Sequence, residues 1–147
     1  MNRAWSAMDV DAIRASFANK DALPSYDLDL RGAPIRFSSR DDVVRYAERV
    51  FAEMRKMGAT MRLSVHDLQC RANATLGVCA QEFDAEVTLG DGTKEAWSFR
   101  GTGAARKEED GWRWTHWHAS LAKMPQLPGA TTPASPSAPA PEGRREP

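Results

Sequence analysis

The stretch from Arg100 to Leu121, RGTGAARKEEDGWRWTHWHASL, predicts two β-strands joined by a tight turn. Asp110-Gly111 is the turn signal, because a two-residue hairpin loop needs positive φ angles that this pair tolerates. Side chains alternate along a strand, so one face of the second strand is expected to carry Trp112, Trp114, His116, His118 and Ser120. A single strand cannot bury so many large rings, and the stretch therefore predicts a sheet, a cover and a pocket.

The segments before this hairpin predict an α+β fold. Apolar residues at helical spacing indicate helices over residues 4–18 and 39–58, and Ser39 begins a capping pattern for the second. Period-two alternation indicates longer strands over 61–71, 75–89, 94–107 and 112–123, with 72–74 as the first turn. Turns this short make an antiparallel meander, so we predict a curved antiparallel sheet covered by N-terminal helices.

A shorter strand is predicted over residues 23–31, before the second helix. Its apolar residues Tyr26, Leu28 and Leu30 alternate with Asp27, Asp29 and Arg31. This alternation is typical of a half-buried strand with its apolar set facing the core.

Composition limits the classes of partner. The 20 basic and 20 acidic side chains form no basic stripe, which argues against a nucleic-acid partner. The start of the sequence lacks the apolar region of a signal peptide, and no later apolar run is long enough to span a bilayer. Cys70 and Cys79 are too few for a disulfide framework, which favours a reducing compartment. The predicted location is the cytoplasm, without a membrane partner.

A change of composition divides the 147 residues in two. Residues 1–124 are long enough for one compact domain. From residue 125 to 147 Pro, Ala and Ser dominate, and such a segment cannot offset the entropy lost on ordering. We therefore predict a disordered C-terminal tail over 125–147.

The order of these elements resembles the nuclear transport factor 2-like superfamily. The last predicted strand is most similar to its SnoaL-like branch, whose members often end in a Gly-Trp, His-x-His and Ser pattern. That pattern corresponds here to Gly111, Trp112, His116, His118 and Ser120, within a resemblance that extends from about residue 5 to residue 123.

The resemblance implies a cone-shaped, half-open barrel with helices over the concave sheet face and a pocket at one end. In such proteins the other sheet face commonly joins a second subunit. The superfamily includes ketosteroid isomerases, polyketide cyclases, dehydratases, epoxide hydrolases and non-catalytic modules, so the resemblance implies architecture and leaves the chemistry open.

A strand register without bulges places the candidate site on one face of the sheet. It puts His118 opposite Gly103, with Asp67 further along the same row. The other predicted pocket-lining residues are Trp97, Trp112, Trp114, His116, Ser120 and Glu82. The opposite face collects Phe83, Trp117 and Leu121 and predicts an apolar homodimer interface or, alternatively, a second apolar layer. In this register the two cysteines lie in different rows and do not pair.

His118 is the candidate general acid or base, with Asp67 as its orienting partner. The alternatives are a buried histidine that braces the sheet and an aspartate in water. His116 and His118 with one carboxylate do not complete a tetrahedral shell, so we predict neither a metal nor a cofactor. Three functions stay open: a pocket for a small apolar ligand, a small isomerase, cyclase or hydrolase, and a non-catalytic dimerisation module.

Overall fold

The computed structural model describes residues 1–20, 22–29 and 32–122, and the predicted tail lies outside these ranges. The described part contains three helices and one six-stranded sheet, which confirms the α+β prediction. The helices are α1 (Asn2–Ser6), α2 (Val10–Ser16) and α3 (Arg40–Lys56). The strands are β1 (Ser25–Leu28), β2 (Pro34–Phe37), β3 (Thr60–Ala72), β4 (Leu76–Thr88), β5 (Lys94–Glu108) and β6 (Gly111–Leu121).

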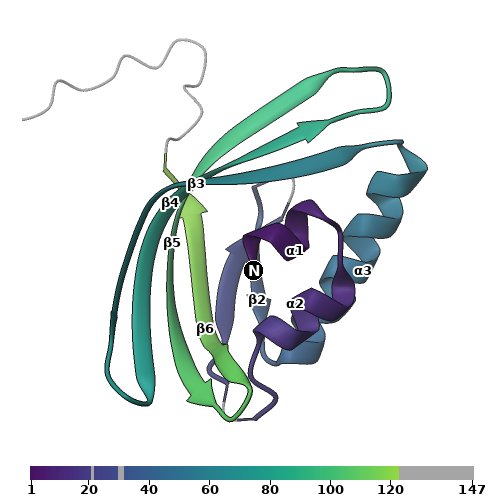
Figure 1. The fold of residues 1–147 in the computed structure, drawn as a ribbon. Helices are drawn as coiled ribbons and strands as arrows, with labels where there is room; N and C mark the ends of the chain where they lie inside the picture. The colour runs from purple at the N-terminus through teal and green to yellow at the C-terminus, as the bar shows by residue number, and fades with distance from the viewer. Residues whose placement is uncertain (21, 30–31, 123–147) are drawn as a thin grey trace, which may run out of the picture.

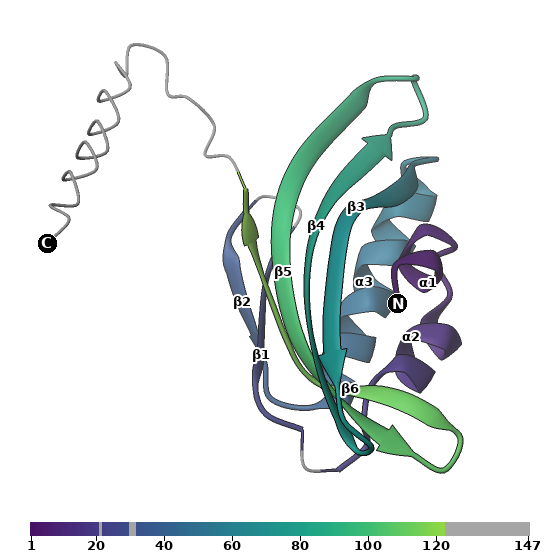
Figure 2. The same cartoon turned by 60° about the vertical axis from the view of Figure 1, so that its left-hand side comes forward.

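The sheet has the order β2-β1-β6-β5-β4-β3 and curves around the three helices, which lie on its concave side (Figures 1 and 2). Every strand pair is antiparallel except β1 with β6, where Tyr26 lies beside His118 in a parallel bridge. This parallel contact was not predicted, and it places the short strand β1 between β6 and the edge strand β2.

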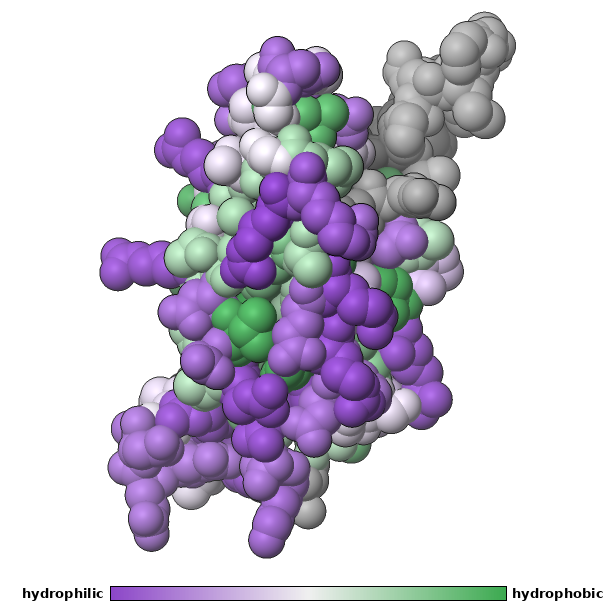
Figure 3. Space-filling view, turned by 90° about the vertical axis from the view of Figure 1, so that its right-hand side faces the viewer, coloured by the Kyte–Doolittle hydropathy of each residue, from purple (hydrophilic) through white to green (hydrophobic). Residues whose placement is uncertain are grey.

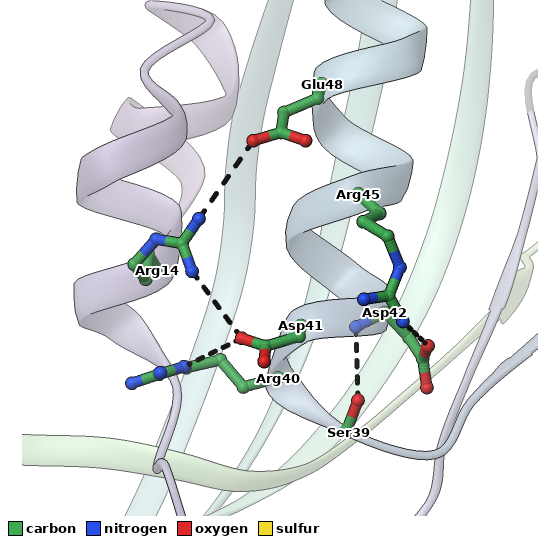
Figure 4. Close-up of polar contacts among 7 residues, drawn as sticks. All are labelled: Arg14, Ser39, Arg40, Asp41, Asp42, Arg45 and Glu48. Atoms are coloured by element: carbon green, nitrogen blue, oxygen red, sulfur yellow. Dashed lines mark hydrogen bonds and ion pairs between the residues drawn. The ribbon is translucent and has the colours of Figure 1, made fainter.

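The predicted first helix is interrupted at Met8, whose φ of 51° is left-handed. Asp9 then caps α2 by accepting a hydrogen bond from the Ala12 amide at 2.9 Å. In α3 the capping prediction is confirmed, because Ser39 Oγ accepts from the Asp42 amide at 3.2 Å (Figure 4).

Ion pairs connect α2 to α3 at the surface. The guanidinium of Arg14 lies 3.5 Å from Asp41 and 4.0 Å from Glu48, both on α3 (Figure 4). These side chains are well exposed, so each pair contributes little to stability. The molecular face on the side of α3 is mainly hydrophilic (Figure 3).

A β-bulge in β6 decides which side chains of this strand face the helices. Ala105 pairs with Trp114 while Ala104 pairs with His116, so Thr115 is the extra residue. Beyond the bulge Trp117 lies opposite Gly103, and His118 lies opposite Thr102. The register predicted without bulges was therefore wrong by one residue for the second half of β6.

The shift puts Trp117 into the core beneath the helices. Trp117 is only 5% exposed, Phe83 is buried beside it, and their ring centroids lie 6.3 Å apart. The predicted dimer band of Phe83, Trp117 and Leu121 was therefore wrong, because all three side chains face the concave side. A homodimer remains a prediction, but these residues can no longer be its interface.

Glycine makes room for the tryptophan rings. A Cβ atom on Gly103 would lie 2.6 Å from the ring of Trp114 and 2.9 Å from that of Trp117. By contrast, a Cβ atom on Gly77 would meet its nearest neighbours, Ala72 and Trp112, at the ordinary distances of 3.4 and 3.5 Å.

We expect Gly103→Ala to lower the free energy of unfolding by about 1–3 kcal/mol, because the added methyl group overpacks the two rings. Gly77→Ala is the matched control and should leave stability unchanged or raise it by up to about 1 kcal/mol, since alanine has the lower entropy cost in a strand. Urea denaturation followed by tryptophan fluorescence measures both. Equal stability of the two variants would contradict the packing described for Gly103.

Cys70 and Cys79 form a disulfide between directly paired residues of β3 and β4, with their Cα atoms 4.2 Å apart. The prediction that they do not pair was wrong, because the turn between β3 and β4 closes at Ala72–Gly77 rather than within 72–74. The side chain of Asn73 builds this turn by accepting hydrogen bonds from the Thr75 and Leu76 amides at 2.9 and 2.8 Å.

The reducing compartment was predicted because two cysteines were considered too few for disulfide bonding. The disulfide removes this argument. Location in the cytoplasm therefore stays a prediction. Within the described residues, no helix has the length and apolar character needed to cross a membrane.

Reduction of this disulfide should lower the free energy of unfolding by about 2–3 kcal/mol, the chain-entropy value for a loop of roughly ten residues. Urea denaturation with and without a thiol reductant tests this. The double variant Cys70→Ser, Cys79→Ser is the control. Its free energy of unfolding should equal that of the reduced wild type and should not change when reductant is added. If the wild type is as stable after reduction as before, with the reduced state of both thiols verified, the disulfide does not stabilise the fold.

Candidate functional site

A cavity of about 370 Å³ lies between the concave face of the sheet and helices α1 and α3. This volume is within the range of small-molecule pockets. Most of the residues that line it are apolar and many are aromatic: Met1, Asn2, Trp5, Phe17, Ser25, Asp27, Leu28, Asp29, Gly32, Phe37, Val43, Tyr46, Val50, Met61, Leu63, Phe83, Ala85, Val87, Trp97, Phe99, Trp117 and Leu121.

Aromatic rings form two opposing walls of the cavity. On the helical side, the ring centroid of Tyr46 lies 6.4 Å from that of Trp5 and 5.4 Å from that of Phe37. On the sheet side, Phe83 and Phe99 are stacked with their centroids 5.1 Å apart. Rings at these separations attract one another, so each group presents packed aromatic surface to the cavity.

Asp27 on β1 brings a carboxylate to this apolar space. Its Oδ1 accepts a hydrogen bond from the Leu28 amide at 2.8 Å, and the indole of Trp117 also donates to its side chain. Burial raises the pKa of Asp27 to about 6, because desolvation of the charged form outweighs the two hydrogen bonds, which lower it. The group can therefore hold or release a proton near neutral pH.

Trp117 also fixes the position of β1. Its backbone amide donates to the hydroxyl of Ser25 at 3.0 Å, and Ser25 is itself buried. Ser25 and Asp27 are two residues apart in a strand, so both side chains point to the same face. One residue of β6 thus positions both polar side chains of β1 through separate hydrogen bonds.

The alternation predicted for β1 was wrong at Tyr26 and Asp27, while Leu28 lines the cavity and Leu30 and Arg31 lie outside the described residues. Tyr26, predicted to be buried, is 46% exposed and lies beside His118 on the outside of the sheet, while Asp27 lines the cavity. Asp27 was therefore missed as a site residue. The usable signal was the spacing Ser25-x-Asp27, because these two polar side chains share the inner face.

The predicted site residues are divided between several places. Trp97 lines the cavity, as expected. Trp114 packs against Trp117 with a centroid distance of 5.6 Å, and the exposed Trp112 lies under the ammonium of Lys107 at 5.7 Å. Neither Trp112, Trp114 nor Gly103 is among the described residues that line the cavity.

The other predicted residues lie on the convex face. His116 Nδ1 lies 2.7 Å from the carbonyl oxygen of Pro24, and Glu82 forms an exposed ion pair with Arg100 at 3.0 Å. Ser120 pairs with Arg100 across the strands, which places it on the same face. The bulge at Thr115 explains their position, because it turns the histidines and Ser120 away from the helices.

The predicted pair of His118 and Asp67 is not formed. His118 is exposed on β6, and Asp67 is exposed on β3, where it accepts a hydrogen bond from Gln69 at 3.3 Å. Strands β5 and β4 lie between them, so the two backbones are about 14 Å apart at the usual strand spacing. Their predicted convergence in one cavity was therefore wrong.

Comparison with known proteins gives one family match. The profile of the SnoaL-like domain family matches residues 1–124. No curated protein matches the sequence.

Solved structures share the fold at low sequence identity. A candidate dehydratase of the nuclear transport factor 2-like family from Streptomyces avermitilis is 14% identical, with a TM-score of 0.68 over 82% of this chain and 88% of that one. A nuclear transport factor 2-like superfamily protein from Salmonella enterica is 15% identical, with a TM-score of 0.63 over 88% and 89%. A candidate calcium/calmodulin-dependent kinase II association domain from Xanthomonas campestris is 17% identical, with a TM-score of 0.66 over 86% and 81%. These similarities establish the fold alone.

Replacing Asp27 with asparagine should stabilise the protein at pH 8. The folded-state pKa of about 6 is above the ordinary value of 3.8, so ionised Asp27 favours unfolding, and this cost grows as pH rises from 3.8 through 6. We expect Asp27→Asn to raise the free energy of unfolding by about 1–3 kcal/mol at pH 8, and by about 1 kcal/mol less at pH 5.

Urea denaturation at the two pH values measures this difference. Asp67→Asn removes an exposed carboxylate and is the control, with little change expected at either pH. A gap between wild type and Asp27→Asn that does not widen with pH would contradict the burial of this carboxyl group.

Proposed function

Because the chain belongs to the SnoaL-like domain family, we propose that it binds a small, largely apolar molecule in the cavity under α1 and α3. The observation that carries this proposal is the pairing of two aromatic walls with a polar group, Asp27, at the strand β1. Ligand sites in proteins commonly combine an apolar lining with a few placed polar groups in this way.

The ligand lies between the walls formed by Trp5, Tyr46, Phe83 and Phe99. A flat or cyclic molecule gains the most there, because it replaces water against ring faces on both sides. Asp27 is its polar contact on the sheet, since the lining residues of β3 to β6 are apolar or have only an indole as polar group, and Ser25 and Asp29 already accept hydrogen bonds from backbone amides.

A second function, proton transfer without a cofactor, is favoured by the protonation state of Asp27. A carboxylate with a pKa of about 6 accepts a proton near neutral pH more readily than an ordinary aspartate. Set in an apolar cavity, it is suited to removing a proton from a carbon next to a carbonyl group. This is the type of step in isomerase, cyclase and dehydratase reactions, and it assigns the base to Asp27 rather than to His118.

β-Tetralone, a flat cyclic ketone with exchangeable protons beside its carbonyl group, tests both functions. Binding should shift the NMR signals of the Trp97 and Trp117 indole N–H groups, because both residues line the cavity. Unchanged indole signals with this ketone and with a set of flat apolar compounds would overturn the binding proposal.

Deuterium exchange of the same ketone in heavy water tests proton transfer. If Asp27 is the base, exchange should exceed the buffer rate, and Asp27→Asn should lower the excess by at least about 100-fold, the usual contribution of a positioned base. His118→Ala, on the convex face, is the matched control and should leave the rate unchanged. Binding without Asp27-dependent exchange would leave a binding protein and exclude the enzymatic function for this ketone.

A further inference from the structure

The charged side chains that line the cavity are all acidic among the described residues. Its described lining residues include two carboxylates, Asp27 and Asp29, and no lysine, arginine or histidine. The one basic group that they carry is the α-amino group of Met1, whose pKa burial lowers, which favours its neutral form. Fixed positive charge is therefore nearly lacking from the described lining.

Asp27 is the carboxylate that a ligand can pair with. Within residues 1–20, 22–29 and 32–122, no basic side chain lies at ion-pair distance from it, and its two hydrogen bonds come from the Leu28 amide and the Trp117 indole. Asp29 serves the turn that follows β1, since its Oδ1 accepts from the Ala33 amide at 2.8 Å.

The aromatic walls have the same sign preference. The face of an aromatic ring is electronegative, and tryptophan and tyrosine attract cations more strongly than phenylalanine does. Trp5 and Tyr46 stand on the helical side of the cavity, and Trp97 and Trp117 on the sheet side. Rings of both walls and one carboxylate thus surround the same space.

We propose that the ligand of this cavity is a flat, apolar molecule that bears a basic nitrogen, and that its ammonium group pairs with Asp27 between the aromatic walls. This inference rests on the proposed binding function and deepens it by naming the ligand class. It also gives the buried carboxylate a partner, because an ion pair with the ligand compensates for lost hydration.

Two probes of nearly equal shape separate charge from apolar fit: β-naphthylmethylamine, a cation at neutral pH, and β-naphthylmethanol, its neutral counterpart. Isothermal titration calorimetry of the full chain at pH 8 should show the amine binding at least about tenfold more tightly than the alcohol. In Asp27→Asn this preference should disappear, so that the amine and the alcohol bind with equal affinity.

The pH dependence provides a test in the wild type alone, should Asp27→Asn fail to fold. Because Asp27 has a pKa of about 6, lowering the pH from 8 to 5 should reduce the preference for the amine by roughly tenfold. The other titratable groups at the cavity are Asp29 just after β1, Tyr46 on α3 and the Met1 α-amino group. Beside Asp27, β2 presents Ile35 and β6 presents Trp117.

The outcomes separate the two proposals. Equal affinity of amine and alcohol at pH 8, or a preference that persists in Asp27→Asn, overturns the ammonium inference and leaves the binding function standing. If neither probe nor any flat apolar compound binds, the binding function itself fails. A preference that depends on Asp27 and on pH supports both.

Discussion

The bulge at Thr115 is the constraint on which the site depends. Without it, β6 would present His116 rather than Trp117 opposite Gly103, and the helices would cover histidines instead of an indole. One extra residue in one strand therefore exchanges the two faces of the second half of β6. The concave face becomes an apolar wall, and the imidazoles of the strand lie outside it.

Trp117 joins the consequences of this bulge into one unit. Its ring fills the space over Gly103, its amide binds Ser25, and its indole donates to Asp27. The core, the parallel contact of β1 with β6 and the polar group of the cavity thus share a residue. Loss of the Trp117 side chain would therefore lower the stability of the fold and, under the proposed function, the affinity for the ligand.

The sequence was sufficient for α3 and the four long strands, and insufficient for the break at Met8 and for the faces of the strands. Ser39 and the apolar period of α3 specify a helix locally, and the four long strands follow from alternation and turn residues. A bulge leaves no comparable local signal, because it depends on how Ala104 and Ala105 pair with a strand elsewhere in the chain. The site was therefore assigned to the wrong face although the fold was anticipated.

Asp27 illustrates why the hydrophobic and polar pattern of a sequence does not predict a buried charged residue. Alternation assigns aspartate to water because burial of a carboxylate costs free energy, which appears here as a pKa raised to about 6. A fold that needed only an apolar core would be more stable with a neutral side chain at this position. The unfavourable term persists beside two aromatic walls in a largely apolar cavity, and a ligand that supplies a positive charge there would offset it. Under the proposed binding function, stability in the empty state and affinity in the bound state thus oppose each other at one residue.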